Sequence, residues 1–331
     1  MTPRRVVVAH HPVGADADPS TRDVLDQVAL VVEGLSALGL PHSTVAVADR
    51  EAAARLEVDG GTVVFNLVEA PPGAPRGQVE VAEEMERRGI PFTGSSAAAL
   101  WLTTDKLATR ERMAANGLPV AAGGRLDPER PRVLDRVAPP WIVKPAWEDA
   151  SVGLDGNPVC SAPEEAVARG RALERRFPGQ PVLLEHLLPG RELNISLLQA
   201  PGGVEVLPLA EIVYVDFPPE EPRVLGIDAK WDPGSFAYTH TVRRFVDPAC
   251  ERELTRDLGG LAQAAWQACS LRGYARVDLR LDEQGRPHIL EVNANPCLSS
   301  DAGFMAAAGQ AGLDAAAVVA RILAAARAEE P

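Results

Sequence analysis

The chain contains 33 basic residues, yet only three of them are lysines, Lys106, Lys144 and Lys230. Lys106 starts a helix-like segment, Lys144 ends an apolar strand, and Lys230 precedes a tryptophan. Lysine offers a compact ammonium charge, which binds phosphate without the fixed two-point geometry of arginine. The three lysines therefore predict contacts with a polyphosphate. The alternative is that all three are ordinary surface residues.

A second candidate site is an apparent β-hairpin near the C-terminus. If its turn is centred on residues 284–285, strand alternation places Asp278 opposite Glu291 and Arg276 opposite Asn293. Two facing carboxylates repel each other, so one must be protonated or a cation must neutralise both. A small set of oxygen ligands favours Mg²⁺, which retains water and phosphate oxygens as further ligands. The hairpin thus predicts a magnesium site, and the alternative is a solvent-facing hairpin with a cross-strand ion pair.

A loop of small residues follows the strand that ends at Lys144. Ala150, Ser151 and Gly153 could let the backbone N–H groups of this loop fold over phosphates. Neither of the glycine-rich signatures GxxxxGK[ST] and GxGxxG occurs in the chain. The loop is a candidate phosphate contact, and a turn in a β-meander is the alternative.

The segment from Glu185 to Glu192 reads as a strand, a Pro-Gly hinge and a new strand. Such a crossover could place a planar base against apolar residues. Glu185 and backbone groups would then read the edge of the base, and Glu192 would accept hydrogen bonds from ribose hydroxyls. The segment predicts a nucleoside site beside the phosphate loop.

The composition limits the kinds of partner. A formal net charge of −13 and an isoelectric point near 5.0 argue against nucleic acid or an anionic membrane as the main partner. No apolar stretch approaches the length of a transmembrane helix, and the run at 6–9 is too short for a signal peptide. The four cysteines lack metal-ligand spacing. We predict a cytoplasmic protein that captures an anionic substrate in a local basic pocket.

A chain of 331 residues exceeds the usual size of a single core, so two or three units are expected. In the first hundred residues, strands alternate with helices, which predicts a mostly parallel α/β sheet. From residue 191 the signals are mainly strands. A long helix, the hairpin and two terminal helices follow. The expected strands before that point are residues 6–9, 45–47, 62–65, 90–94, 141–144 and 182–185. The expected helices are residues 20–39, with a capping box at 20–23, then 78–88, 105–117, 163–177 and 248–272.

Taken in order, these segments resemble the ATP-grasp superfamily, most closely its D-alanine–D-alanine ligase group. The resemblance covers about residues 60–310. The matching stretches are residues 90–95, 104–106, 117–120, 142–145, 185–192, 211–212, 229–231, 273–278 and 290–293. It implies an α/β (α+β) chain with an ATP-grasp fold. The expected units are an N-terminal parallel α/β (pre-ATP-grasp) domain at 1–102, a central lid subdomain at 103–189 and a C-terminal catalytic subdomain at 190–331.

The resemblance also implies a role for each candidate residue. Contacts with the ATP phosphates fall to Lys106, Lys144 and Lys230. Adenosine would be held by Glu185, the backbone of Leu188, and Glu192. Glu148 and Ser151 would complete the nucleotide site. Two Mg²⁺ ions, for which Mn²⁺ could substitute, would be bound by Asp278, Glu291 and Asn293. The catalytic residues would be Arg276, Lys230 and Ser151.

The implied reaction joins a small-molecule carboxylate to an amine. The carboxylate attacks the γ-phosphate of ATP and forms an acyl phosphate, and the amine then displaces phosphate to form an amide. Both steps need neutralised charge and a site closed to water. Residues 148–153 and 216–235 are the expected lids. The resemblance further implies a homodimer.

The substrate-reading segments depart from the D-alanine–D-alanine ligase pattern. Where the family reads Thr-x-Pro-Gly-Met-Thr after the hairpin, Cys297 stands in place of the glycine, and Ala302-Gly303 replaces a Ser-Leu pair. The first serine of the phosphate loop is missing. Residues 20–23 only loosely replace a Ser-x-Glu segment, and 65–69 stand where a His-Gly turn is usual. The residues expected to bind ATP thus match the family pattern, while those expected to bind the amino-acid substrates differ from it.

We therefore predict an ATP-dependent acid–amino-acid ligase that acts on an amino acid, dipeptide or specialised metabolite and does not make D-alanyl-D-alanine. One alternative is an authentic D-alanine–D-alanine ligase of cell-wall synthesis. Another is a non-catalytic nucleotide-binding regulatory module, against which the presence of Arg276 argues, because binding alone would not require it. Cys297 could be a nucleophile, but a packed small thiol is the simpler interpretation.

Overall fold

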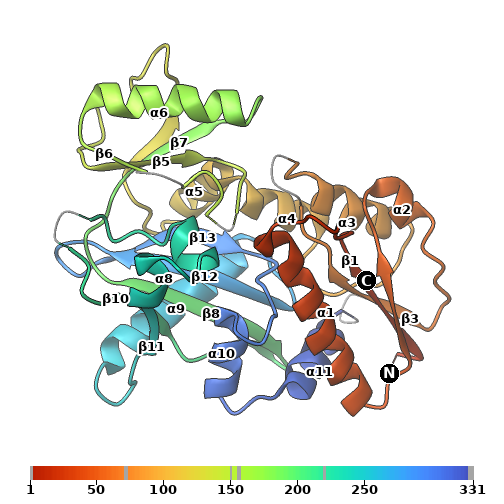
Figure 1. Cartoon of the computed structure of the whole chain (residues 1–331). Coiled ribbons are helices and arrows are strands. Elements are labelled where there is room, and N and C mark those ends of the chain that lie inside the picture. The colour runs from red at the N-terminus through yellow and green to blue at the C-terminus, as the bar shows by residue number, and fades with distance from the viewer. Residues whose placement is uncertain (1–2, 71–73, 150, 155–157, 219–220, 327–331) are drawn as a thin grey trace.

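The computed structural model describes residues 3–70, 74–149, 151–154, 158–218 and 221–326. Within this part of the chain there are three β-sheets, and each is built from its own stretch of sequence (Figure 1). The predicted boundary between residues 102 and 103 falls inside helix α4 (Ala97–Thr104). The boundaries of the three units stay a prediction.

The first sheet is parallel, as predicted. Its strands are β1 (Arg5–His10), β2 (His42–Ala46) and β3 (Thr62–Leu67), in the order β2-β1-β3. Its helices are α1 (Pro19–Ala37), α2 (Arg50–Ala54) and α3 (Gly77–Arg87). Every residue of β3 is buried, which is typical of a parallel strand covered on both faces.

Two local predictions for this unit were wrong. The expected strand at 90–94 forms only a single bridge, between Phe92 and Val64. Helix α1 begins at Pro19, and its cap is Asp18, two residues before the start of the predicted capping box; Asp18 accepts from the backbone N–H of Thr21. An Asp cap followed by proline at the first helical position is a standard helix start.

The second sheet is antiparallel and lies with α6 in the upper part of Figure 1. Helices α4 and α5 (Lys106–Ala115) lead into it, and α4 was not predicted. The strands are β4 (Gly123–Leu126), β5 (Trp141–Pro145), β6 (Val159–Cys160) and β7 (Val182–His186), in the order β4-β7-β5-β6. Helix α6 (Pro163–Arg176) packs on the sheet, and together they enclose a hydrophobic core of their own.

The third sheet is antiparallel and has six strands in the order β11-β10-β8-β12-β13, with β9 paired to β8. The strands are β8 (Glu192–Ala200), β9 (Gly203–Val206), β10 (Ala210–Tyr214), β11 (Thr241–Phe245), β12 (Tyr274–Leu281) and β13 (Pro287–Asn293). The helices are α7 (Ile227–Trp231), α8 (Phe236–His240), α9 (Arg252–Ala268), α10 (Gly303–Gln310) and α11 (Ala315–Ala325). Its core continues into that of the first unit, where α1 packs against α11.

The β12–β13 hairpin has the predicted pairing, with Asp278 opposite Glu291 and Arg276 opposite Asn293. The pairing depends on a bulge that was not predicted. Beyond Asp278 the register shifts so that Leu279 pairs with Ile289, which leaves one extra residue on β13.

No single helix in the described ranges combines the length and apolar composition needed to cross a bilayer; α10 and α11 pass that test only as a pair bent by 107°.

Candidate functional site

A cavity of about 540 Å³ is lined by residues from all three units. Every candidate site residue predicted from the sequence lines it. These residues are Lys106, Lys144, Glu148, Ser151, Glu185, Leu188, Glu192, Lys230, Arg276, Asp278, Glu291 and Asn293. The three sheets thus bring segments that lie far apart in sequence to one place.

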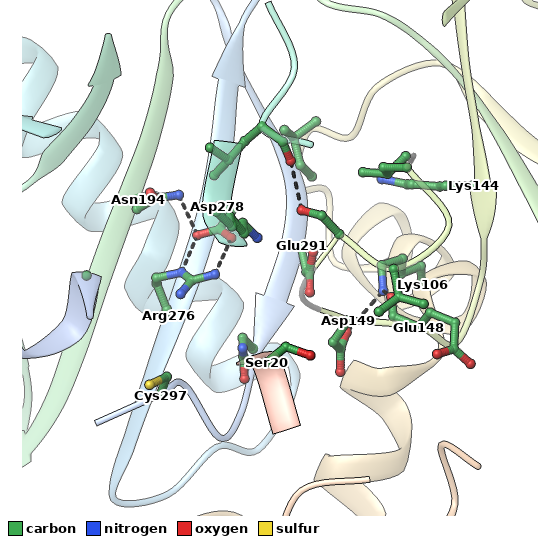
Figure 2. A pocket seen from close by; sticks show the side chains of 18 of the residues that line it. Ser20, Lys106, Lys144, Glu148, Asp149, Asn194, Arg276, Asp278, Glu291 and Cys297 are labelled. Carbon is green, nitrogen blue, oxygen red and sulfur yellow. Dashed lines mark hydrogen bonds and ion pairs between the residues drawn. The ribbon is translucent and has the colours of Figure 1, made fainter. Parts of the chain in front are cut away.

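Glu291 on β13 is the carboxylate of this cavity on which the most cationic side chains act. Four cationic side chains from four elements act on it: Lys106 of α5, Lys144 of β5, Arg276 of β12 and Lys230 of α7 (Figure 2 labels all but Lys230). Burial alone would raise the pKa of Glu291, but the four charges outweigh it and hold that pKa below its usual range. The carboxylate is therefore ionised at neutral pH and sits in a strongly positive field.

Lys106 is held at the floor of the cavity with only 5% of its surface exposed. Its Nζ donates to the backbone oxygen of Glu148 at 2.5 Å and to Asp149 Oδ1 at 3.1 Å. Burial opposes the charge of Lys106, yet Glu291 and Asp149 raise its pKa above the usual value. Asp149 was not among the predicted site residues, although it lies next to Glu148 in the predicted loop.

Glu185 on β7 is almost fully buried and paired with two cations. Its carboxylate lies 2.8 Å from Lys144 Nζ and 2.5 Å from a guanidinium nitrogen of Arg110 on α5. The side chains of Glu185, Lys144 and Arg110 are 1%, 11% and 12% exposed. Arg110 was not predicted, because α5 and β7 are brought together only by the fold. The triad fixes Lys144 in the cavity wall.

Arg276 and Asp278, two residues apart on β12, form a two-point ion pair. Arg276 Nε donates to Asp278 Oδ1 at 2.7 Å, and its second nitrogen donates to Oδ2 at 2.8 Å. Asn194 on the neighbouring strand β8 adds a bond of 2.8 Å to Oδ1, and Figure 2 shows both side chains pointing at Asp278. Asn194 was not predicted, since only the β8–β12 register places it opposite Asp278.

Asp278, Glu291 and Asn293 are the residues of this site best suited to a metal. They offer carboxylate and amide oxygens on paired strands, which are the ligands that Mg²⁺ prefers. Among the described residues no cluster of three or more His, Cys, Asp or Glu side chains is arranged for a metal. A small set of protein oxygens fits Mg²⁺, which is completed by waters and substrate phosphates, better than it fits a calcium cage or zinc.

The two expected lids touch each other. Ser151 has a positive φ of 68°, and its hydroxyl donates to the backbone oxygen of Leu225 at 2.8 Å. Gly153 folds back on the strand before it: a Cβ there would lie 2.7 Å from a ring carbon of Pro145. Only glycine fits this approach. Ala150 lies outside the described residues.

The predicted nucleoside segment runs along another wall of the cavity. Leu188 is buried, and the Glu192 carboxylate accepts from the Tyr214 hydroxyl at 3.0 Å and lies 3.7 Å from Arg280. The hinge at Gly190 packs tightly, because a Cβ there would come within 2.5 Å of the backbone oxygen of Leu281. This contact places the segment directly beside the hairpin.

Cys297 lies in the part of the cavity formed by the segments that depart from the family pattern. Its thiol donates to Asp23 Oδ2 at 2.8 Å and lies 3.0 Å from the Ser299 hydroxyl. Burial and the neighbouring Asp23 charge raise the pKa of Cys297 far above its usual value. A thiol that stays protonated is a poor nucleophile, so the arrangement favours a packed, hydrogen-bonded thiol.

Glu69 is a further carboxylate at this end, in the segment that replaces the His-Gly turn. Gln27 of α1 donates to Glu69 Oε1 at 2.8 Å and accepts from the backbone N–H of Leu298 at 3.1 Å. Burial is the main cause that raises the pKa of Glu69 to about 7. Gln27 thereby ties the loop after β3 to the loop after β13.

Comparison with known sequences supports the arrangement. The family model for the D-ala D-ala ligase C-terminus matches residues 127–324. A D-alanine–D-alanine ligase of Chromohalobacter salexigens is 33% identical over 241 residues, which are 72% of this chain and 70% of that protein. An uncharacterized protein of Sinorhizobium fredii, y4sG, is 32% identical over 252 residues, covering 76% of this chain and 70% of that protein.

Comparison with known structures agrees with the sequence matches on the fold. A crystal structure of D-alanine–D-alanine ligase from Bacillus anthracis superposes with a TM-score of 0.74 at 18% identity, covering 98% of this chain and 97% of that chain. The same enzyme complexed with ATP gives a TM-score of 0.72 at 16% identity, with the same coverage. The predicted ATP-grasp architecture is confirmed.

Proposed function

The chain belongs to the D-alanine–D-alanine ligase family and is an ATP-dependent carbon–nitrogen ligase, and from this membership we propose that it joins a carboxylate to an amine through an acyl phosphate. The observation that carries the proposal is the convergence of Lys106, Lys144, Lys230 and Arg276 on Glu291 within one cavity. Such a concentration of positive charge suits a triphosphate and the charge that develops during phosphoryl transfer.

ATP would lie between the second sheet, with strand order β4-β7-β5-β6, and the third sheet, which contains the β12–β13 hairpin. Its phosphates would meet the three lysines, while Leu188 and Glu192 would hold adenosine. The ion pairs of Glu185 with Lys144 and Arg110 support a fixed position for Lys144. Further support is that the related Bacillus anthracis enzyme was crystallised with ATP.

Asp278, Glu291 and Asn293 would hold Mg²⁺, whose charge would offset that of the phosphates. Arg276 and Asn194 orient Asp278 by their hydrogen bonds. The four surrounding cations keep Glu291 ionised and therefore able to act as a ligand.

In the first step, a carboxylate oxygen of the substrate attacks the γ-phosphorus and ADP leaves. Arg276 and Lys230 would stabilise the negative charge on the transferred group. In the second step, the amine nitrogen attacks the acyl carbon, phosphate leaves, and the nitrogen loses a proton. The Ser151–Leu225 contact would close the lids and exclude water, which would otherwise hydrolyse the acyl phosphate.

The substrates we propose are an amino acid, dipeptide or specialised metabolite other than the D-alanine pair. Support comes from Cys297 and Ala302-Gly303, which replace the family's residues where the amino-acid substrates are expected to bind. Formation of D-alanyl-D-alanine is the second candidate, favoured by relatives that bear that name. The presence of Arg276 in the cavity, paired with Asp278, argues against a regulatory module that only binds nucleotide, because binding alone would not require it. A cytoplasmic homodimer stays a prediction from the sequence.

The test is release of ADP and phosphate from Mg²⁺-ATP with a panel of D-, L- and β-amino acids and dipeptides, followed by mass spectrometry of the products. We expect phosphate release that requires both a carboxylate and an amine, with one amide formed per phosphate. Turnover with D-alanine alone at the highest rate of the panel would favour the second candidate. Tight ATP binding without any substrate-dependent release would contradict the proposal.

A further inference from the structure

Asp23 of α1 and Glu69, which follows β3, are two carboxylates of the cavity that the proposed chemistry does not use. Both lie beside the same amide nitrogen: Gln27 Nε2 is 2.8 Å from Glu69 Oε1 and 3.5 Å from Asp23 Oδ2. Asp23 also accepts from the side chains of Cys297 and Ser299. All of these donors are uncharged, and in the part of the chain that the structure describes neither carboxylate forms an ion pair.

The two carboxylates destabilise each other's charge. Burial raises the pKa of Glu69 to about 7, and the charge of Asp23 adds to that effect. Burial likewise raises the pKa of Asp23. Two carboxylates this close share a proton or are neutralised by a cation. Arg276 of the same cavity is already matched by Asp278, so the missing cation would come from a ligand.

His11 supplies an independent third acceptor. It lines the same cavity, is only 7% exposed, and its Nε2 lies 3.1 Å from the backbone oxygen of Thr21 on α1. A carbonyl oxygen can only accept, so Nε2 carries the proton and Nδ1 of the neutral ring keeps a free lone pair. Burial is the main cause that lowers the pKa of His11, which keeps the ring neutral at pH 7. Among the described residues Nδ1 has no hydrogen-bond partner, which indicates a donor group on a ligand.

The carboxylate pair lies near the reaction centre. Cys297 donates to Asp23 at 2.8 Å and is close enough to Arg276 for the two charges to interact. Figure 2 shows Cys297 and Arg276 on the same side of the cavity. A substrate whose carboxylate is activated beside Arg276 would therefore present its nitrogen atoms to Asp23 and Glu69.

We propose that Asp23, Glu69 and His11 bind two cationic nitrogens of the carboxylate substrate, which is therefore a diamino acid. The inference rests on the proposed ligase function. An amino acid with one ammonium group would leave one of the two carboxylates unmatched. Because both carboxylates lie beside Gln27 Nε2, they are close together, so the second nitrogen must be close to the first. A short side chain, as in 2,3-diaminopropionate, fits this spacing better than the side chain of lysine.

The test compares acids of matched size with and without the second cation. The acids are 2,3-diaminopropionate, the similarly sized 2-aminobutyrate, and lysine, each as both enantiomers, with Mg²⁺-ATP. Hydroxylamine serves as the amine for every acid, because it attacks acyl phosphates to give hydroxamates. The enzymes are wild type, Glu69→Gln, Asp23→Asn and the control Asp26→Asn, whose side chain is exposed one turn further along α1. Thermal unfolding of each variant establishes that it is folded.

For wild type we expect kcat/KM for phosphate release to be about 10- to 100-fold higher with 2,3-diaminopropionate than with 2-aminobutyrate, the range for a charge-assisted hydrogen bond. Lysine should fall below 2,3-diaminopropionate. Glu69→Gln and Asp23→Asn should each lose most of this preference, chiefly through a higher KM for the diamino acid. Asp26→Asn should keep the preference of wild type.

Equal use of 2,3-diaminopropionate and 2-aminobutyrate by wild type would overturn the inference and leave the ligase intact. So would a higher kcat/KM for lysine than for 2,3-diaminopropionate, or the same preference in Asp23→Asn as in Asp26→Asn. An absence of phosphate release with every acid would instead contradict the proposed ligase function, and the inference with it.

Discussion

The ion-paired triad at Glu185 allows a quantitative prediction. Glu185→Gln preserves the size of the side chain but removes its charge, so Lys144 and Arg110 are left without their shared counter-ion. These two side chains are only 11% and 12% exposed, so water can replace the lost partner only in part. The substitution should therefore be strongly destabilising although it creates no cavity.

The size of the effect follows from the burial of the triad. Removing one partner of a buried ion pair costs about 3–5 kcal/mol. A loss of 1 kcal/mol lowers the melting temperature of a domain of 150–250 residues by about 2–4 °C. The Glu185→Gln protein should thus melt at least about 6 °C below wild type.

Thermal unfolding followed by fluorescence, without nucleotide, is the suitable assay. The control is Glu174→Gln, which removes an exposed carboxylate from helix α6 of the same unit. The control should melt within about 1 °C of wild type, since exposed charges contribute little. If Glu185→Gln and Glu174→Gln melt together, the triad is not the buried, mutually neutralising group that the distances indicate.

Three further predictions concern the cavity. Arg276→Lys should lower kcat about 10²- to 10³-fold while the Kd for ATP, measured by calorimetry, stays within about threefold of wild type, because the lost interaction acts on the transition state. Because burial raises the pKa of Glu69 to about 7 in the fold, this group contributes stability below its unfolded pKa of about 4.5 that is lost as the pH rises through 7. Glu69→Gln should remove that loss. The fall in melting temperature from pH 5 to pH 8 should therefore be smaller in the variant than in wild type. Cys297→Ala should retain phosphate release within about threefold, because a protonated thiol is no nucleophile.

Each of these predictions has a contrary outcome. A tenfold weaker Kd for ATP in Arg276→Lys would assign the residue to ground-state binding. An unchanged pH dependence of unfolding in Glu69→Gln would show that another group titrates near neutrality. If Cys297→Ala lowered the rate of phosphate release by more than 100-fold, the thiol would have to take part in the reaction.

The sequence predicted the hairpin well because its information is local. Alternation along two strands and a short turn are enough to place Asp278 opposite Glu291, and the structure has that pairing. The same argument from alternation cannot detect a bulge, which inserts one residue without changing the pattern on either side. The pairing was therefore correct although the register around the turn was not foreseen.

The missed site residues share a physical cause. Asn194 reaches Asp278 only through the β8–β12 register, and Arg110 reaches Glu185 only because α5 lies across β7. Long-range contacts of this kind leave no periodic signal in the sequence. They have to be read from the fold.

The formation of an acyl phosphate is the central claim, and isotope transfer tests it most directly. The carboxylate substrate identified in the panel would be labelled with ¹⁸O at both oxygens, and the released phosphate analysed by mass spectrometry. If the carboxylate attacks the γ-phosphate, each phosphate carries one ¹⁸O atom and the amide keeps the other. Phosphate without label would show that its oxygen came from water, and the mechanism built on Glu291, its four cations and the closed lids would be contradicted.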